Sequence, residues 1–507
     1  MPIVGNPNPH ARATFLVVAA AVFVSNLDLF IVNVALPAMN QQFHGSTLAD
    51  LSWVLNGYAI VFAALLVPAG RIADRVGHRT GFLTGLALFT ASSALCALAP
   101  GVPWLVGARL LQAAGAALLL PTSLALLLGA TAPERRPRAV RAWASIGGIA
   151  AGLGPVLGGL LVEADWRWVF LVNLPVGAAA LLAGRRVLPR RPAPASTDRP
   201  AAAAPTGSSS TTTPTTPTTP TAPTAPAPEP WPDLAGAALL TAAIALLAVG
   251  LVRSAAWGWG SPGVLGCLAG AAVLAAGFLR RSAHHPAPVV ELPLLRVPVF
   301  AAANATALLF TVAFAGMLLT SVLWCQQVWG YSALRTGLAV APGPLLVPPI
   351  ALGAGPLQRR LGPGPLAALG LLCFGAGIAW WALTVGTAPD YPAGLLPGML
   401  LTGLGVGLTL PTLIGAAAAA LPPTRFATGS AVTTMGRQIG AVIGVAVTVS
   451  VLGTPRSAPQ ALAAFHHAWW AITGATALAV VAALVLARAR TAPAAPAATP
   501  GKQPVSA

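Results

Sequence analysis

Long apolar runs alternate along the chain with short polar segments. An α-helix that crosses the hydrocarbon core of a bilayer needs about 20 apolar residues, so each run predicts a membrane-spanning helix. The predicted spans are 13–36, 52–72, 80–99, 103–131, 139–162, 167–188, 234–252, 263–279, 299–325, 337–357, 363–385, 392–420, 427–453 and 464–487. This pattern predicts an all-α integral membrane protein with 14 transmembrane helices.

Comparison of the chain with itself predicts two related halves. Segment 113–122 is echoed by 403–412, and segment 70–77 is echoed by 355–362, at offsets of 290 and 285 residues. Nearly equal offsets indicate a duplication. Spans one to six and nine to fourteen are therefore predicted to form two six-helix bundles related by pseudo-symmetry, with spans seven and eight as two inserted helices. In this architecture the substrate site lies between the halves.

The polar segments complete the predicted domain organisation. The linker is rich in Pro, Thr and Ala and is predicted to be a disordered cytoplasmic tether, because proline disrupts helices and the composition cannot form a core. The predicted segments are a cytoplasmic N-terminus 1–12, an N-terminal six-helix bundle 13–188, the linker 189–232, two extra helices 233–281, a cytoplasmic loop 282–298, a C-terminal six-helix bundle 299–487 and a cytoplasmic tail 488–507.

Composition and charge exclude an ordinary soluble protein. Charged residues make up 8% of the chain, whereas a soluble surface needs about a quarter to a third of its positions charged. The net charge of +17 comes from arginines clustered in short loops, which favours a membrane protein over a nucleic-acid-binding one. With the N-terminus inside, only Arg167, Arg253, Arg335 and Arg456 lie on the outer side, so both termini are predicted to be cytoplasmic. The preference for arginine over lysine, together with abundant alanine, indicates a GC-rich bacterial genome, so the membrane is predicted to be a bacterial inner membrane.

Two charged residues stand out inside the predicted spans. At 1.5 Å per residue, Asp28 lies about 12 Å and Arg109 about 9 Å from the outer ends of spans one and four. They are therefore predicted to lie at similar depth, with Gln112 on the same helix face as Arg109. Burial favours a neutral carboxyl group and a nearby guanidinium favours an ionised one, so a change in their separation would load or release a proton. The alternative is a static buried ion pair that locks the two spans together.

Several motifs resemble those of the fourteen-span drug:proton antiporter family within the major facilitator superfamily. Residues 27–37 are similar to the first-helix motif, although Phe30 replaces the usual Thr. Residues 109–115 are similar to the span-four motif, and 70–79 to the loop between spans two and three. The resemblance implies proton coupling through Asp28 and Arg109. It also implies a cytoplasmic gate or latch formed by Gly70, Asp74, Arg75, Gly77 and Arg79.

Span five carries a glycine-rich pattern similar to the motif that marks exporters. Small residues at this spacing also allow close helix packing, and both interpretations are retained. Segments 166–175, 330–338 and 437–440 resemble further signatures of the fourteen-span family. The motif residues are Gly148, Gly152, Gly154, Pro155, Gly158 and Gly159. Polar residues predicted to contribute to a substrate pocket are Asn33, Gln112, Gln326 and Gln438.

These features predict a proton-coupled antiporter that exports small amphipathic compounds, such as drugs or antibiotics, by alternating access. Its predicted partners are the substrate, protons and the lipid bilayer; it is expected to be a functional monomer with no metal, cofactor or nucleic acid. Apart from the loop residue Asp390, spans nine to fourteen contain no Asp or Glu, which favours neutral, monocationic or zwitterionic substrates. A facilitator-type permease without proton coupling is the alternative. A membrane-embedded enzyme is less favoured, because hydrolase motifs are missing.

Overall fold

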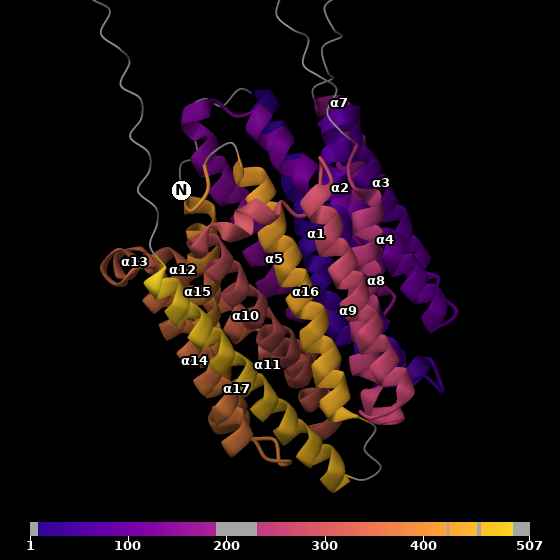
Figure 1. The fold of residues 1–507 in the computed structure, drawn as a ribbon. Helices are drawn as coiled ribbons and strands as arrows, with labels where there is room; N and C mark the ends of the chain where they lie inside the picture. The colour runs from indigo at the N-terminus through magenta and orange to yellow at the C-terminus, as the bar shows by residue number, and fades with distance from the viewer. Residues whose placement is uncertain (1–8, 189–230, 423–424, 454–457, 490–507) are drawn as a thin grey trace, which may run out of the picture.

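The computed structural model describes residues 9–188, 231–422, 425–453 and 458–489. All but the last two residues of the predicted linker 189–232 lie outside these ranges. Residues 1–8 of the predicted N-terminal segment and 490–507 of the predicted tail also lie outside them. Within the described ranges the protein is helical and contains no strand (Figure 1).

The chain forms helices of very different length. They are α1 (Pro9–Gln42), α2 (Leu48–Val76), α3 (His78–Ala97), α4 (Val102–Gly129), α5 (Arg136–Ala164), α6 (Trp168–Leu171), α7 (Asn173–Val187), α8 (Leu234–Trp257), α9 (Pro262–His284), α10 (Pro298–Leu323), α11 (Ala333–Val340), α12 (Pro342–Gly353), α13 (Gly355–Leu361), α14 (Pro363–Thr384), α15 (Leu396–Ala419), α16 (Phe426–Leu452) and α17 (Ala458–Arg488). In the described residues, 14 segments are long and apolar enough to cross a membrane, which confirms the predicted number.

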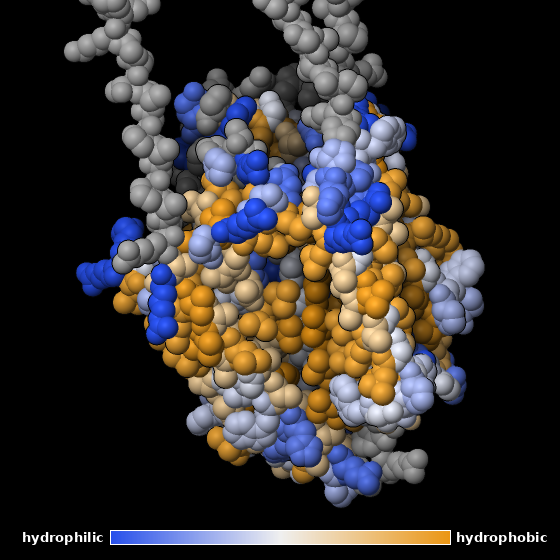
Figure 2. All heavy atoms as spheres, in the orientation of Figure 1, coloured by the Kyte–Doolittle hydropathy of each residue, from blue (hydrophilic) through white to orange (hydrophobic). Residues whose placement is uncertain are grey.

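The surface of the bundle has the polarity expected of a membrane protein. Figure 2 shows apolar side chains covering its middle, whereas hydrophilic side chains gather toward its two ends. Because the number of spans is even, α1 begins and α17 ends at the same end of the bundle, here called the termini face. The opposite end is called the far face.

Local sequence explains where several helices begin. At the start of α2, the Thr47 hydroxyl accepts from the backbone N–H of Asp50, and the Asp50 side chain accepts from the backbone N–H of Thr47. This reciprocal pair satisfies two N–H groups that a helix end leaves without a partner. Ser261 and Ser332 cap α9 and α11 in the simpler one-way form.

Four predicted spans are not single α-helices in the structure. One of them, span twelve, begins with a turn of π-helix at Tyr391–Leu395. Span six consists of α6 and α7, and span ten consists of α11 and α12, which meet at Ala341. Pro342 follows directly, and a proline cannot donate the hydrogen bond that would continue the preceding helix. Span nine ends in a turn of π-helix at Trp324–Val328. The apolar runs therefore gave the number of spans but not their internal breaks.

Helix packing confirms two bundles with the same arrangement. In the first half, α1 packs along α5 and α3 packs along α4. In the second half, α10 packs along α16 and α14 packs along α15. These pairs correspond to the same positions in the two six-helix repeats. The halves meet along two seams, one formed by α2 and α16 and the other by α5 with α11 and α12.

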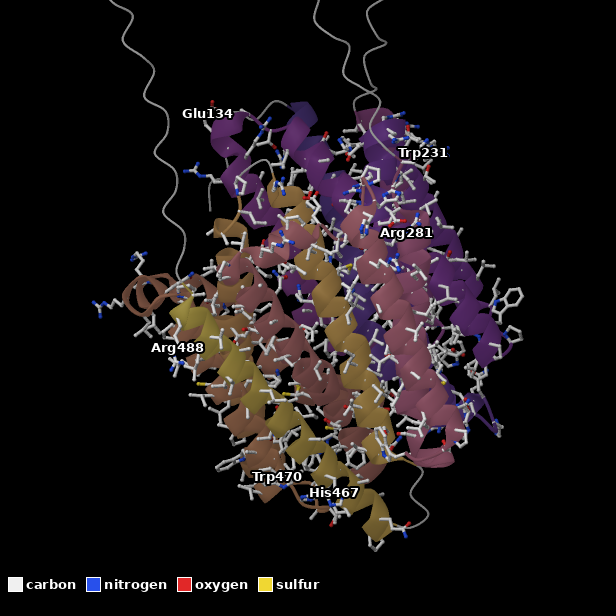
Figure 3. All side chains as sticks on the ribbon, viewed as in Figure 1. Glu134, Trp231, Arg281, His467, Trp470 and Arg488 are labelled. Carbon is white, nitrogen blue, oxygen red and sulfur yellow. The ribbon has the colours of Figure 1, made fainter. Side chains whose placement is uncertain are left out.

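The two inserted helices cover one of these seams. Helix α8 packs against both α2 and α16, and α9 packs on α8. Arg253 of α8 forms an ion pair with Asp50 of α2 at 2.9 Å, and Ser254 shares a hydrogen bond of 2.6 Å with Ser450 of α16. Arg281 of α9, labelled in Figure 3, forms an ion pair at 2.5 Å with Asp233, the residue that caps the start of α8. The insertion is therefore fastened to both halves.

Candidate functional site

A buried carboxylate lies at the centre of the first half. Asp28 of α1 has no exposed surface, and Arg109 of α4 forms an ion pair with it through Nη1. Gln112 donates from Nε2 to Asp28 Oδ1 at 3.1 Å, and Asn173 of α7 donates from Nδ2 to the same oxygen at 3.2 Å. Three side chains thus donate to one buried acid, the arrangement that an ionised carboxylate accepts.

The guanidinium of Arg109 is held from several sides. Nη1 also donates to Gln112 Oε1 at 2.6 Å, and Nε donates to the carbonyl oxygen of Val54 at 3.2 Å. The Tyr58 ring lies 4.2 Å from Arg109 Cζ, within the range of a cation–π interaction. These contacts hold the guanidinium beside Asp28 and restrict its movement toward any other anion.

Ser93 of α3 links the two amides of this network. Its Oγ accepts from Gln112 Nε2 at 2.7 Å and from Asn173 Nδ2 at 3.1 Å. The network therefore joins α1, α3, α4 and α7 within the first half. A proton added to Asp28 would turn one acceptor oxygen into a donor and set it against the N–H donors that face it. Proton binding at this acid must therefore rearrange its partners.

A cavity of about 330 Å³ lies between the two halves. It is lined by α1, α2, α4 and α5 of the first half and by α15 and α16 of the second. The lining residues of the second half come from the end of α15 and the first half of α16, and both segments lie toward the termini face. The cavity is therefore on the side of the membrane where the chain begins and ends, and its volume suits a small organic ligand.

Tyr58 separates the buried acid from this cavity. Its ring lines the cavity and also contacts the Arg109 guanidinium. On α1, Ser25 and Leu29 line the cavity, whereas Asp28, which lies between them in the sequence, has no exposed surface and does not line it. The acid and the cavity thus share helices α1 and α2, and a small movement of either helix would change both.

A smaller apolar pocket adjoins the cavity. Its volume is about 70 Å³, and Phe314, Met317 and Met399 of the second half contribute to its walls. Phe30 and Gly148 line both the pocket and the cavity. Together, the two spaces provide polar side chains near the termini face and apolar side chains deeper between the halves.

The halves close tightly on the side away from the cavity. A Cβ atom added to Gly159 of α5 would lie 2.5 Å from the carbonyl oxygen of Ala333. Gly337 of α11 packs against Pro155 in the same way. Glu163, near the end of α5, accepts from the backbone N–H of Leu334 at 3.0 Å. The glycines permit this close approach, and Glu163 adds a hydrogen bond across the seam.

The other residues of the span-five motif face different neighbours. Gly154 and Gly158 face α1, where an added Cβ on Gly154 would meet Phe30 Cβ at 2.6 Å. Gly152 faces α12, and Gly148 has open space around it at the cavity wall. The motif therefore provides one surface for packing within the first half, one for contact with the second half and one for the cavity.

The predicted latch lies at the termini face between α2 and α3. Gly77 alone joins these helices, and its φ of +95° strains any residue with a side chain. Arg79 donates from Nε to the carbonyl oxygen of Leu188 at 3.2 Å and from Nη2 to that of Arg185 at 2.8 Å. Arginine here satisfies carbonyl groups at and just beyond the end of α7, where cations are favoured.

The remaining latch residues make separate contacts. Asp74 lies 3.7 Å from the ring of His78, and the guanidinium of Arg75 lies 4.5 Å from the ring of Trp231. Gly70 faces α4 at ordinary van der Waals distance. The structure therefore places all five latch residues near one end of α2, and their gating role stays a prediction.

The four predicted pocket residues have different surroundings. Gln438 lines the cavity. Gln112 belongs to the Asp28 network, and Asn33 donates to a carbonyl oxygen of its own helix at 3.0 Å. Gln326 donates across the halves to the carbonyl oxygen of Val34 at 3.2 Å. The cavity is thus lined by one of these four residues, and substrate contact by any of them stays a prediction.

Sequence reasoning missed four residues of this region. Asn173 and Arg437 both stand inside segments noted for their resemblance to the family, 166–175 and 437–440, but neither was assigned a role. A search for every charge inside a span would have found Arg437. Ser93 and Tyr58 carry no such signal, because nothing in the sequence separates them from other polar residues in helices.

Comparisons with known proteins show which family the chain belongs to. Residues 18–445 match the sequence model of the Major Facilitator Superfamily. A probable actinorhodin transporter of Streptomyces coelicolor is 34% identical, with 87% of this chain and 72% of the relative covered. The tetracenomycin C resistance and export protein of Streptomyces glaucescens is 33% identical, with coverages of 81% and 69%. A cephamycin export protein of Amycolatopsis lactamdurans is 31% identical, with coverages of 91% and 90%.

Solved structures show the same fold at low sequence identity. A bacterial homologue of the lysosomal transporter Spinster, in an inward-facing conformation, gives a TM-score of 0.62 at 15% identity, covering 96% of this chain and 100% of the other. A peptide transporter of the POT family gives 0.61 at 17% identity, with coverages of 94% and 97%. The chain therefore belongs to the major facilitator superfamily and is a multi-pass membrane transporter, not an enzyme.

Proposed function

We propose that this protein exports small amphipathic compounds, including antibiotics, from a bacterial cytoplasm in exchange for protons. The observation that carries the proposal is the buried Asp28 network beside the cavity between the halves. An ionisable residue at membrane depth is costly to keep and is often part of a proton pathway. The names of the relatives, which include exporters and resistance proteins, support the direction and the class of cargo.

The coupling would act through the partners of Asp28. Protonation would remove the charge that Arg109 and the two amides now neutralise, so their contacts would rearrange. Because α1 carries Asp28 on one face and cavity residues on another, this rearrangement would alter the cavity. Proton binding and substrate binding would then favour different conformations, which is what antiport requires.

The arginine bias indicates that the termini face is cytoplasmic. The cavity would then be accessible from the cytoplasm while the α5 and α11 seam closes the outer side. This is the state in which an exporter loads its substrate. Alternating access would follow when that seam opens and the latch region at Asp74 and Arg79 closes against the other half.

Asp28→Asn tests this proposal. In inverted membrane vesicles with an imposed pH gradient, lipophilic antibiotics and dyes should dissipate the gradient when the wild-type protein is present. Asp28→Asn should abolish the response, because an amide cannot carry the proton. The matched control is Asp390→Asn, since Asp390 is an exposed acid that caps a helical turn and asparagine can also cap.

The outcomes separate the alternatives. Gradient dissipation that survives Asp28→Asn would refute the role of this acid. Substrate flux measured directly without any proton flux would favour a facilitator. Loss of the response in Asp390→Asn as well would show that the loss is not specific to the buried acid.

A further inference from the structure

Arg437 brings a second charge to the cavity. It lies on α16, 11 residues after the first residue of that helix, which places it about 16 Å along the helix axis from the termini face. It lines the cavity together with Gln438, Thr433 and Thr434. The side chain is thus near the middle of the membrane, where a charged residue is energetically costly and usually has a functional role.

The guanidinium of Arg437 has no partner among the described residues. Its Nε is buried without a hydrogen bond. Among the described residues that line the cavity, Arg437 is the single charged side chain. A half-buried charge without a counter-ion from the protein is less stable than a paired one, so an anion that enters the cavity is expected to be stabilised at this position.

The nearby ion pair does not supply that anion. Asp28 is already paired with Arg109 and receives two further hydrogen bonds. These two charges cancel, and the cavity keeps the positive charge of Arg437. The distribution of acidic residues alone favours neutral, monocationic or zwitterionic substrates, whereas the positive charge at the cavity wall favours an anionic group.

The neighbours of Arg437 define the rest of the ligand. The hydroxyl groups of Thr433 and Thr434 donate to carbonyl oxygens of their own helix, at 3.0 and 2.9 Å. Arg437 and Gln438 are therefore the side chains of this group with donors left for a ligand. Deeper between the halves, the apolar pocket with Phe314 offers room for a hydrophobic body.

We propose that the exported compounds are amphipathic organic anions, with the anionic group bound by Arg437 and the apolar part reaching toward the pocket at Phe314, Met317 and Met399. The proposal rests on the proposed export function and narrows it to a substrate class. A carboxylate, an acidic phenol or a sulfonate would each provide the planar or clustered oxygens that a guanidinium binds through paired hydrogen bonds.

The test uses three probes that share one apolar body. They are 4-(1-pyrenyl)butanoic acid, its methyl ester and the corresponding 4-(1-pyrenyl)butylamine. Dissociation constants are measured by equilibrium dialysis with the full chain in phosphatidylcholine nanodiscs, against empty nanodiscs that report partitioning into lipid. No gradient is applied, so the measurement reports binding alone.

The variants separate charge from shape. Arg437→Gln removes the charge at similar length, and Arg437→Lys keeps the charge without the paired geometry. Arg488→Gln is the matched control, because Arg488 is an exposed arginine at the end of α17 (Figure 3) and does not line the cavity. A monodisperse elution profile and an unchanged or higher unfolding midpoint establish that each variant is folded.

The acid should bind the wild-type protein more tightly than the ester or the amine. Arg437→Gln should weaken binding of the acid about tenfold and binding of the ester less than about twofold, because a charge-assisted contact is lost only for the acid. Arg437→Lys should lie between these results, and Arg488→Gln should match the wild type. The wild-type protein binding the acid no better than the ester, or Arg437→Gln weakening both equally, would overturn the proposal.

Transport distinguishes this inference from the proposed function. Binding of the acid that depends on Arg437, with no movement of the probe when a pH gradient is imposed, would contradict export by proton exchange and leave the anion site standing. Gradient-driven transport of the acid and the ester at equal rates by both wild type and Arg437→Gln would support export and overturn the anion site.

Discussion

Asp28 and Arg437 are charges inside the membrane-spanning bundle with opposite surroundings, Asp28 fully buried and Arg437 half-buried at the cavity wall. The carboxylate of Asp28 is surrounded by donors from Arg109, Gln112 and Asn173. The guanidinium of Arg437 has no partner among the described residues and leaves Nε buried and unsatisfied. Removal of one partner from a buried ion pair lowers the stability of the fold strongly, because the other charge is left buried and unpaired. Removal of a charge that has no partner carries no such cost. The two arginines should therefore respond differently to the same substitution.

Replacement of each arginine by glutamine tests this difference. Arg109→Gln should lower the free energy of unfolding by about 3–5 kcal/mol, because it leaves Asp28 without its counter-ion. Arg437→Gln should change it by less than about 1 kcal/mol, because the replaced guanidinium is half-buried and has no partner among the described residues to lose. Thermal unfolding in nanodiscs, followed by tryptophan fluorescence, compares the two. Equal destabilisation by both substitutions would mean that Arg437 has a structural partner.

Helix α5 packs closely against two helices, α1 in its own half and α11 in the other half. Gly154 and Gly158 bring it close to α1, the helix that carries Asp28, and Gly159 brings it close to α11 in the other half. Movement of α1 would therefore be passed to the seam that closes the far face. The small residues make the closed state possible, since a side chain there would hold α5 and α11 apart.

Gly159→Ala should weaken closure of this seam. The added Cβ would lie 2.5 Å from the carbonyl oxygen of Ala333, so the halves must separate locally. Gly148→Ala is the matched control on the same helix, because nothing lies within 4 Å of its added Cβ. The distance between spin labels at positions 165 and 335 should increase and broaden for Gly159→Ala and not for Gly148→Ala. An unchanged distance in both variants would show that the seam accommodates the methyl group.

The sequence predicted spans and depths better than contacts. Counting residues from the span ends placed Asp28 and Arg109 at similar depth, and the structure brings them together with Gln112. Depth does not fix how each helix is rotated, so the arithmetic could not show that Asn173 completes the network. It also could not show that Tyr58 stands between the acid and the cavity, because that position depends on the packing of α1, α2 and α4 together.

At the scale of the whole molecule, the inserted helices change how the halves can move. Helix α8 is fastened to α2 by the ion pair of Arg253 with Asp50 and to α16 by the hydrogen bond of Ser254 with Ser450. Both attachments lie toward the far face. In the alternating-access cycle proposed above, one half would therefore pivot on the other near this seam while the α5 and α11 seam opens.

Two substitutions measure how firmly α8 is attached. Arg253→Gln removes the ion pair with Asp50, which is partly exposed and should contribute less than about 1 kcal/mol. Asp50→Ala removes the same pair and also the reciprocal cap with Thr47, which should add about 1 kcal/mol. Asp50→Ala should therefore lower the unfolding midpoint more than Arg253→Gln does. The reverse order would mean that α8 depends on this ion pair more than α2 depends on its cap.

The position of α8 also determines how the cavity meets the lipid. A bundle of two six-helix halves has two seams along which a compound dissolved in the membrane can slip between them. Here α8 and α9 cover the seam of α2 and α16, whereas no further described helix packs along both α5 and α12. Among the described helices, the seam of α5 and α12 is therefore the one left uncovered. If the proposed substrates reach the cavity from the lipid, they would have to enter along this side of the bundle.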